Sequence, residues 1–498
     1  MGIIIRIWLL LSILVISSAT AYAYEDTKPV LQNPPYKTIS AKVIQEQATI
    51  SPINYDHVVV IGDLNLDGAD CKYIKIANSI IRGNVSFLGT TFTDNANFEG
   101  TTFLGKTEFN GSRFAGDAYF NCSHFSEPAN FTESAFIGPA TFDYSTFNEM
   151  ADFSAELFST SGSFYNCTFA EDALFYLSQF NGVYANFEST HFLKGIDFSA
   201  CPCEAFLSFA DSKVEDNADF HGCRFVGGIR FLNSTFLGDS NFARCHFSED
   251  SRFDNASFNN TADFDSAKFD GPSFFGGTIF GGDILFNGAQ FLAPADLADV
   301  QFKGDLALNS SKISTMVLDR STFSPKSQLY LAKADINRFM VGWAMIKDIL
   351  SYDSSAYLSL VKNYKDMGMS DADDCYYQYR SVTQDMREWG WAKIVDMLAN
   401  ITCGYGVRAD RPIYCSVVLI AFCSAILWGG KGLRKPTERY KNACLFDSLY
   451  YCLAIFFTIP LPDLKPVGNF KYVPVFLRAI SWTLFALMIA TLSKVMIK

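Results

Sequence analysis

The sequence predicts a mainly β fold: a long β-solenoid followed by a helical connector and a two-helix membrane module. Three observations lead to this prediction. Phenylalanine recurs every five or six residues from Phe87 to Phe323, the apolar period becomes helical after about residue 334, and two long apolar segments lie beyond residue 412. A repeat of this length has to be interpreted before any shorter motif.

The repeat unit is 11 residues long and contains two short strands. Its phenylalanines are spaced alternately by five and six residues, as in Phe87, Phe92 and Phe98, and the register slips by one residue between Phe180 and Phe187. Side chains alternate along a strand, so each Phe and the small residue two positions before it face inward together. The polar residue between them faces water.

These units, such as Ala96-Asn97-Phe98-Glu99-Gly100, resemble the pentapeptide-repeat family over residues 58–332. The resemblance implies a right-handed quadrilateral β-helix. Because every second unit here has one extra residue, four faces take 5, 6, 5 and 6 residues, or about 22 residues per coil. Gly, Asp, Asn and Ser are expected at the corners, where φ is positive or side chains bond to the backbone.

The coil length makes a prediction about three cysteines. Cys201, Cys223 and Cys245 are each 22 residues apart, so they should be neighbours on one face. Free cysteine packs as a small apolar residue, and we interpret these thiols as a buried ladder. The alternative is a disulfide between two rungs in an oxidising compartment.

Composition disfavours several classes of function. The chain has 48 Phe among 498 residues and a net charge of −12. Residues 58–332 contain 23 Asp and 11 Glu against 9 Lys and 7 Arg. The repeat therefore has a net charge of −18, and the rest of the chain has a net charge of +6. An acidic repeat is unsuited to nucleic-acid binding. Without nucleotide, hydrolase or zinc motifs, the sequence predicts no catalytic residue, cofactor or metal site.

The amino terminus is typical of a secretory signal peptide over residues 1–23. Arg6 precedes a short apolar core, Ile7–Ile16, and Ala21-Tyr22-Ala23 offers small residues for cleavage. The alternative is an uncleaved signal anchor. Residues 24–57 contain several prolines, and we expect an extended arm there.

Export would make N-glycosylation sequons usable. Ten occur, although a repeat rich in Asn, Ser and Thr generates them by composition, so only some should carry glycans. They are Asn84, Asn110, Asn121, Asn130, Asn166, Asn233, Asn255, Asn259, Asn309 and Asn400.

A helical connector is predicted over residues 333–405. Apolar and aromatic residues fall at helical spacing in the segments 343–350, 357–364, 372–379 and 394–398. Ser370 is a plausible N-cap, with Asp371 and Asp373 in the following turn. We interpret the apolar stripes as core and expect the helices to cap the open end of the rod.

The membrane module covers residues 406–498. Ile413–Trp428 and Val475–Leu492 are apolar spans flanked by Lys, Arg and Trp. Between them, a half-helix over 445–457 and a short loop resemble the pore of two-helix potassium channels. The filter-like loop is Thr458, Ile459, Pro460, Leu461, Pro462 and Asp463.

The filter-like loop departs from the channel pattern T-V-G-Y-G-D. Pro460 and Pro462 stand where the filter has its glycines. Proline fixes φ at about −65° and cannot adopt the positive φ open to glycine. The sequence therefore predicts that this loop does not conduct potassium selectively.

Charge predicts the orientation in the membrane. The loop 430–474 holds seven Lys and Arg residues, more than either flank. The positive-inside rule places this loop in the cytoplasm and the solenoid outside, which agrees with a signal peptide. A channel would have the opposite orientation.

Two functions of different classes follow. The first is a non-enzymatic surface protein that presents an acidic solenoid for binding or scaffolding. Its partners would be membrane lipid and an extracellular protein, wall or cation ligand. The second is an ion-channel subunit that forms a homo-oligomer through the membrane module. A DNA-mimicking rod is disfavoured by the signal segment, and the combination of modules is similar to that of archaeal cell-surface proteins.

Overall fold

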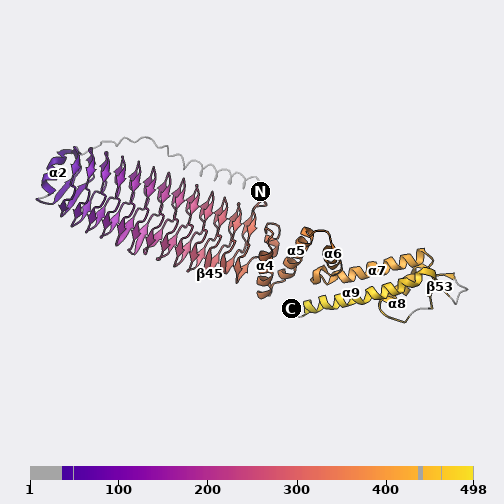
Figure 1. Cartoon of the computed structure of the whole chain (residues 1–498). Coiled ribbons are helices and arrows are strands. Elements are labelled where there is room, and N and C mark those ends of the chain that lie inside the picture. The colour runs from indigo at the N-terminus through magenta and orange to yellow at the C-terminus, as the bar shows by residue number, and fades with distance from the viewer. Residues whose placement is uncertain (1–35, 49, 436–440, 461–462, 497–498) are drawn as a thin grey trace, which may run out of the picture.

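The computed structural model describes residues 36–48, 50–435, 441–460 and 463–496. It shows a long rod of short, stacked strands (Figure 1), followed by a group of helices and then by two long helices that lie side by side. The signal peptide predicted over 1–23 lies outside the described residues.

The rod is a parallel β-solenoid of about 14 turns with about 22 residues per coil, which confirms the predicted fold class. Each strand pairs with the equivalent strand of the next coil, so Phe103 lies beside Phe125. One coil contains β11 (Thr102–Phe103), β12 (Thr107–Glu108), β13 (Arg113–Phe114) and β14 (Ala118–Tyr119). The alternating short and long spacing of these strands produces the four faces.

The predicted slip in the repeat is also confirmed. β23 (Thr168–Phe169) pairs with β27 (His191–Phe192), which lies one residue further along the chain than the regular repeat would place it. The next pairing, of β27 with β31 (Lys213–Val214), returns to the regular spacing. The extra residue is absorbed by one coil, and the strands beyond it keep their inward and outward faces.

Phenylalanine fills the interior of the rod in stacked columns. Phe142 lies parallel to Phe120 in the coil before it, with ring centroids 4.8 Å apart. It meets Phe131 edge to face at 5.4 Å. The distance along a column matches the spacing of hydrogen-bonded strands, so one backbone period satisfies both the ladder and the ring stacking.

Many corners of the rod place residues in the left-handed region of backbone conformation. Gly100 and Gly111 have φ of +64° and +66°, as expected for glycine corners. The equivalent corner position is taken in later coils by Tyr144 and Leu177, with φ of +61° and +59°. The corner geometry is therefore imposed by the coil even where the local residue disfavours it.

The expected extended arm over 24–57 is folded in its described part. β1 (Lys37–Ser40) pairs with β3 (Val58–Ile61), and β2 (Ile53–Asp56) pairs with β6 (Ile74–Ala77). The intervening α2 (Ala41–Ala48) buries Ala41 and Ile44 in the rod's core. This segment covers the first coil, because the apolar end of a solenoid has to be shielded from water.

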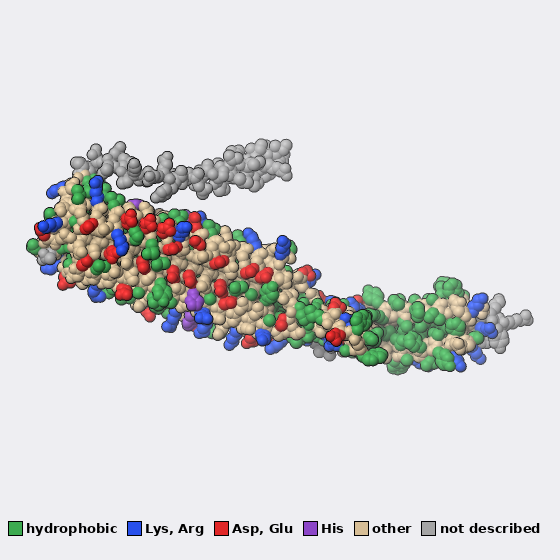
Figure 2. Space-filling model, turned by 45° about the horizontal axis from the view of Figure 1, so that its top comes forward, with side chains coloured by type: hydrophobic (Ala, Val, Ile, Leu, Met, Phe, Trp, Pro, Cys, Tyr) green, Lys and Arg blue, Asp and Glu red, His purple; other side chains and the backbone are tan. Residues whose placement is uncertain are grey.

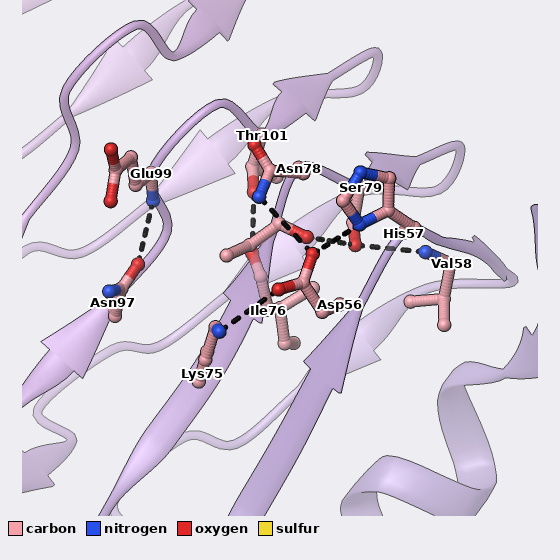
Figure 3. Close-up of polar contacts among 11 residues, drawn as sticks. Asp56, His57, Val58, Lys75, Ile76, Asn78, Ser79, Asn97, Glu99 and Thr101 are labelled. Carbon is pink, nitrogen blue, oxygen red and sulfur yellow. Dashed lines mark hydrogen bonds and ion pairs between the residues drawn. The ribbon is translucent and has the colours of Figure 1, made fainter. Parts of the chain in front are cut away.

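Polar contacts join this segment to the following coil (Figure 3). Asp56 accepts hydrogen bonds from Lys75 Nζ at 3.0 Å and from Asn78 Nδ2 at 3.1 Å. The Val58 amide donates to Ser79 Oγ at 3.1 Å. Residues 36–48 and 50–57 are thus part of the solenoid.

The carboxyl end of the rod is closed by helices, as expected. The last strand is β52 (Phe339–Met340), which lies beyond the predicted boundary at 332. α3 (Trp343–Ile346), α4 (Ser354–Asp366) and α5 (Asp371–Met386) follow, and their buried apolar residues belong to the rod's own core cluster. Asn363 exchanges two hydrogen bonds with the backbone of Phe339 at 2.9 and 2.8 Å.

Three later helices form a second, separate core. α7 (Asp410–Gly429), α8 (Leu445–Phe456) and α9 (Val473–Met496) pack around Ile420, Tyr451, Ile455 and Leu477. A small sheet at the far end joins β53 (Leu433–Lys435) to β54 (Lys441–Asn442) and β55 (Lys465–Pro466). By length and composition, two helices in the described residues can cross a membrane, Asp410–Gly429 and Gly468–Ser493.

The phenylalanine columns can be tested by replacing Phe142 with alanine in the full chain. We expect this variant to lose about 3–5 kcal/mol of stability, because removal of a buried ring that contacts its column and its neighbours leaves a cavity. The solenoid's circular dichroism, followed during urea denaturation in detergent, measures the loss.

Glu149→Ala is the matched control, since Glu149 is exposed on the same coil. Its effect should stay within about 0.5 kcal/mol. Equal effects of Phe142→Ala and Glu149→Ala would contradict the account of the core.

Candidate functional site

The three cysteines predicted to stack do lie in successive coils. The amide after Cys223, that of Arg224, donates to the Cys201 carbonyl at 3.0 Å, and the amide after Cys245, that of His246, donates to the Cys223 carbonyl at 2.9 Å. All three side chains are buried, and all are free thiols.

Each of the three thiols is hydrogen-bonded to the backbone of the neighbouring coil. The Cys201, Cys223 and Cys245 thiols donate to carbonyls of the coil before them at 2.9, 2.8 and 2.9 Å. Burial raises the pKa of Cys201 and Cys245 well above the ordinary thiol value. At Cys223 burial acts in the same direction but is outweighed by hydrogen bonds from these two thiols, which lower its pKa to about 5. A disulfide between two rungs stays a prediction that non-reducing peptide mass spectrometry tests.

The sequons differ in exposure. Five of the ten asparagines are exposed and five are half-buried. The exposed ones are Asn84, Asn166, Asn233, Asn255 and Asn259, and the half-buried ones are Asn110, Asn121, Asn130, Asn309 and Asn400. Asn400 accepts hydrogen bonds at Oδ1 from Tyr377 and Arg411, which hold its side chain in place.

The filter-like loop follows directly on α8, as predicted. Thr458 has φ of +55°, and the Ile459 amide donates to the Ala454 carbonyl at 2.9 Å, which closes the end of the helix. Ile459 and Pro460 are exposed, and so is Asp463. Leu461 and Pro462 lie outside the described residues.

A cationic and aromatic column on the rod was missed from the sequence. Arg230 on β34 (Ile229–Arg230) is in register with Arg252 on β38 (Ser251–Arg252). Arg230 stacks on the ring of Phe206 at 4.7 Å, and Arg252 on that of Phe274 at 4.5 Å. The column could have been predicted from the sequence, because Arg230 and Arg252 are 22 residues apart and take the same outward position in successive coils.

This column borders a surface hollow of about 410 Å³ whose wall includes Phe206, Gly228 and Glu249. Arg252 lies 3.7 Å from Asp254, whereas Arg230 makes no ion pair with any described residue. Two guanidinium groups on adjacent rungs are suited to bind a carboxylate or phosphate. The same hollow also carries two carboxylates, Glu249 and Asp250, so its wall holds groups of both charges.

One buried acidic group was also missed. Glu156 takes the inward position that Ser134 and Ser178 occupy one coil before and after it, where their hydroxyls donate to the carbonyls of Phe109 and Phe153. Glu156 is fully buried, and neither of its carboxyl oxygens has a hydrogen-bond partner among the described residues. Burial raises its pKa well above the usual value, because it disfavours the charged form of the carboxyl group.

The apolar stripe of α6 (Trp391–Cys403) is exposed, so its interpretation as core is wrong. Ile394, Val395 and Leu398 are exposed, together with Trp391. In the first three connector helices the stripe does pack into the core, at Trp343, Leu360 and Cys375 for example. The helical spacing in the sequence identified the apolar face of α6 correctly, but the prediction that this face packs into a core is wrong.

No group of three or more His, Cys, Asp or Glu residues suited to a metal ion occurs in the part of the chain that the structure describes. Comparison with protein families finds pentapeptide repeats (9 copies) at residues 76–121, 209–257, 253–301 and 264–312. The rod is therefore a β-solenoid that contains pentapeptide repeats at these residues. Neither the curated proteins nor the solved structures give a match.

Glu156 generates a prediction of pH dependence. Its pKa is raised in the folded state above the ordinary value of 4.5, so the fold is most stable while the carboxyl is protonated in both states. Stability should fall as pH rises above about 4.5, by up to about 1.4 kcal/mol per pH unit, until the folded-state pKa is reached. Denaturation midpoints at a series of pH values measure this.

Glu156→Ser should remove that slope and raise stability at neutral pH, because a serine hydroxyl can donate to the Phe131 carbonyl as its neighbours do. Glu149→Ser makes the same change at an exposed site on the neighbouring stretch of the rod. An unchanged slope in Glu156→Ser would show that another group titrates.

Proposed function

We propose that this chain is a non-enzymatic, membrane-anchored surface protein that presents an acidic pentapeptide-repeat solenoid for binding or scaffolding. The observation that carries the proposal is the separation of two surfaces along the molecule (Figure 2). Acidic side chains are spread over the rod, whereas hydrophobic side chains cover the end that carries α7 and α9. Among the described residues, only that end has helices apolar enough for lipid.

The proposed orientation places the rod outside the cell. The far end of α7 and α9 carries the basic loop 430–474, which the positive-inside rule assigns to the cytoplasm. The solenoid joins the opposite end of these helices through α4, α5 and α6. A rod outside the cell would also bring the exposed sequons to a compartment where glycans are added.

An ion-channel subunit is the second candidate. It is favoured by α8, an apolar half-helix that packs between the two long helices and ends in the filter-like loop. Against it stands Pro460 at a filter position, because a proline cannot take the backbone conformations of glycine. A channel would also have the loop outside the cell and the rod inside.

Two native cysteines distinguish these orientations. Cys122 is exposed on the rod and Cys444 is exposed in the basic loop, whereas most other cysteines are buried. A membrane-impermeant maleimide added to intact expressing cells should label Cys122 at once and Cys444 only after permeabilisation. Cys122→Ser and Cys444→Ser identify the two labelled peptides.

The reverse pattern, with Cys444 labelled first, would contradict the surface-protein proposal and favour a channel. Planar-bilayer recording on the purified protein then decides whether ions pass, with Pro460→Gly as the comparison. A bilayer that stays silent in both proteins counts against the channel.

The ligand of the rod is proposed to carry a carboxylate or phosphate group that binds at Arg230 and Arg252. Both arginines are held by aromatic rings, which preorganises them. An acidic sugar of a cell wall is one such ligand.

Calorimetric titration with glucuronate, against glucose as the neutral comparison, tests this site. We expect glucuronate to bind more tightly, and Arg230→Gln with Arg252→Gln to abolish the difference. Arg244→Gln, which changes an exposed arginine elsewhere on the rod, should leave it unchanged. Equal binding of glucuronate and glucose to the unmodified protein would rule the site out.

A further inference from the structure

α6 is fixed in place by its polar side. Asp396 is buried and accepts a hydrogen bond from Arg380 Nη2 at 2.8 Å. It also pairs with Arg387 at 3.1 Å. One turn further, Asn400 accepts a hydrogen bond from the Tyr377 hydroxyl at 3.1 Å. The helix therefore cannot turn its opposite side inward without leaving a buried carboxylate unpaired.

The opposite side is a continuous apolar row. Trp391, Val395 and Leu398 are 82%, 60% and 56% exposed, and Ile401 continues the row at helical spacing. Trp389, just before the helix, is 79% exposed. Single exposed apolar residues are common on protein surfaces, but a row with two tryptophans indicates a surface that something covers.

The position of α6 identifies what covers it. The helix packs against both α7 and α9, and a short turn, η1 (Gly404–Gly406), leads directly from it into α7. The apolar row therefore leads into the start of α7, at the end of the two candidate spans that faces the rod. Basic groups lie around it, including Lys393, whose ammonium lies 5.3 Å from the centre of the Trp389 ring.

We propose that α6 lies in the surface of the bilayer, with its apolar row sunk into the boundary between headgroups and acyl chains. This inference rests on the proposed membrane anchoring. Tryptophan and lysine together are typical of that boundary, and an amphipathic helix with such a face is buried there by about 5–10 Å. A bilayer would cover the apolar row of α6 and the apolar surfaces of the two spans together.

The consequence is a fixed base for the rod. α6 is tied through Asp396 to α5, and α5 belongs to the cap whose core is continuous with the solenoid. A helix held in the membrane surface would thus restrict the tilt of the whole rod. Two spanning helices alone would allow the rod to swing about the turn at Gly404–Gly406.

Tryptophan fluorescence in proteoliposomes tests the inference on the full chain. Variants that keep one tryptophan, with the others changed to Phe, are reconstituted in lipids brominated near the headgroup or deep in the acyl chain. Trp389 and Trp391 should be quenched more by shallow than by deep bromines. Trp482, in the middle of α9, should show the reverse, and Trp343, 5% exposed in the rod's cap, should be unquenched.

The outcomes separate the two levels of the proposal. Quenching of Trp482 without quenching of Trp389 and Trp391 would overturn the interfacial position of α6 and leave the membrane anchor standing. Unquenched Trp482 would overturn the anchor itself. Unquenched but blue-shifted Trp389 and Trp391 would show that protein, such as a second copy of the chain, covers the row, and would also overturn the inference.

Discussion

The structure depends on a match between two distances. The spacing between hydrogen-bonded parallel strands is also the spacing at which phenylalanine rings stack. Phe131 and Phe153 lie 4.8 Å apart and nearly parallel, and similar contacts recur along the columns. Each coil therefore adds a row of backbone hydrogen bonds and a layer of rings together. The rod needs a cover at both ends, since each terminal layer of the core would otherwise meet water.

Much of this could be predicted from the sequence, because a repeated backbone leaves a repeated pattern. The alternating spacing that starts at Phe87, Phe92 and Phe98 was sufficient to predict the coil, its register and the slip after Phe180. It did not predict the altered spacings at the two ends of the rod, where Val59 pairs with Ile80 and Leu306 with Leu329. The stacked cysteines followed from the same register. These are local consequences of side-chain alternation on strands, which one chain displays by itself.

Other features escaped because they depend on what lies opposite a residue. The proline-containing segment before Val58 has no repeat period, so nothing in it indicated that it would pair with the first coil. Glu156 stands in a position that serine fills in the coils on either side, and its burial follows only from the coil that surrounds it. The helical period of Ile394 and Leu398 cannot tell a core from a surface that another partner covers.

The central claim is that an acidic rod stands on a membrane through a separate helical base. Electron cryomicroscopy of the full chain in lipid nanodiscs tests it most directly. The account predicts α7 and α9 inside the disc and the solenoid projecting from one side of it. Helices found outside the disc, packed against the rod or against a second copy of the chain, would contradict it.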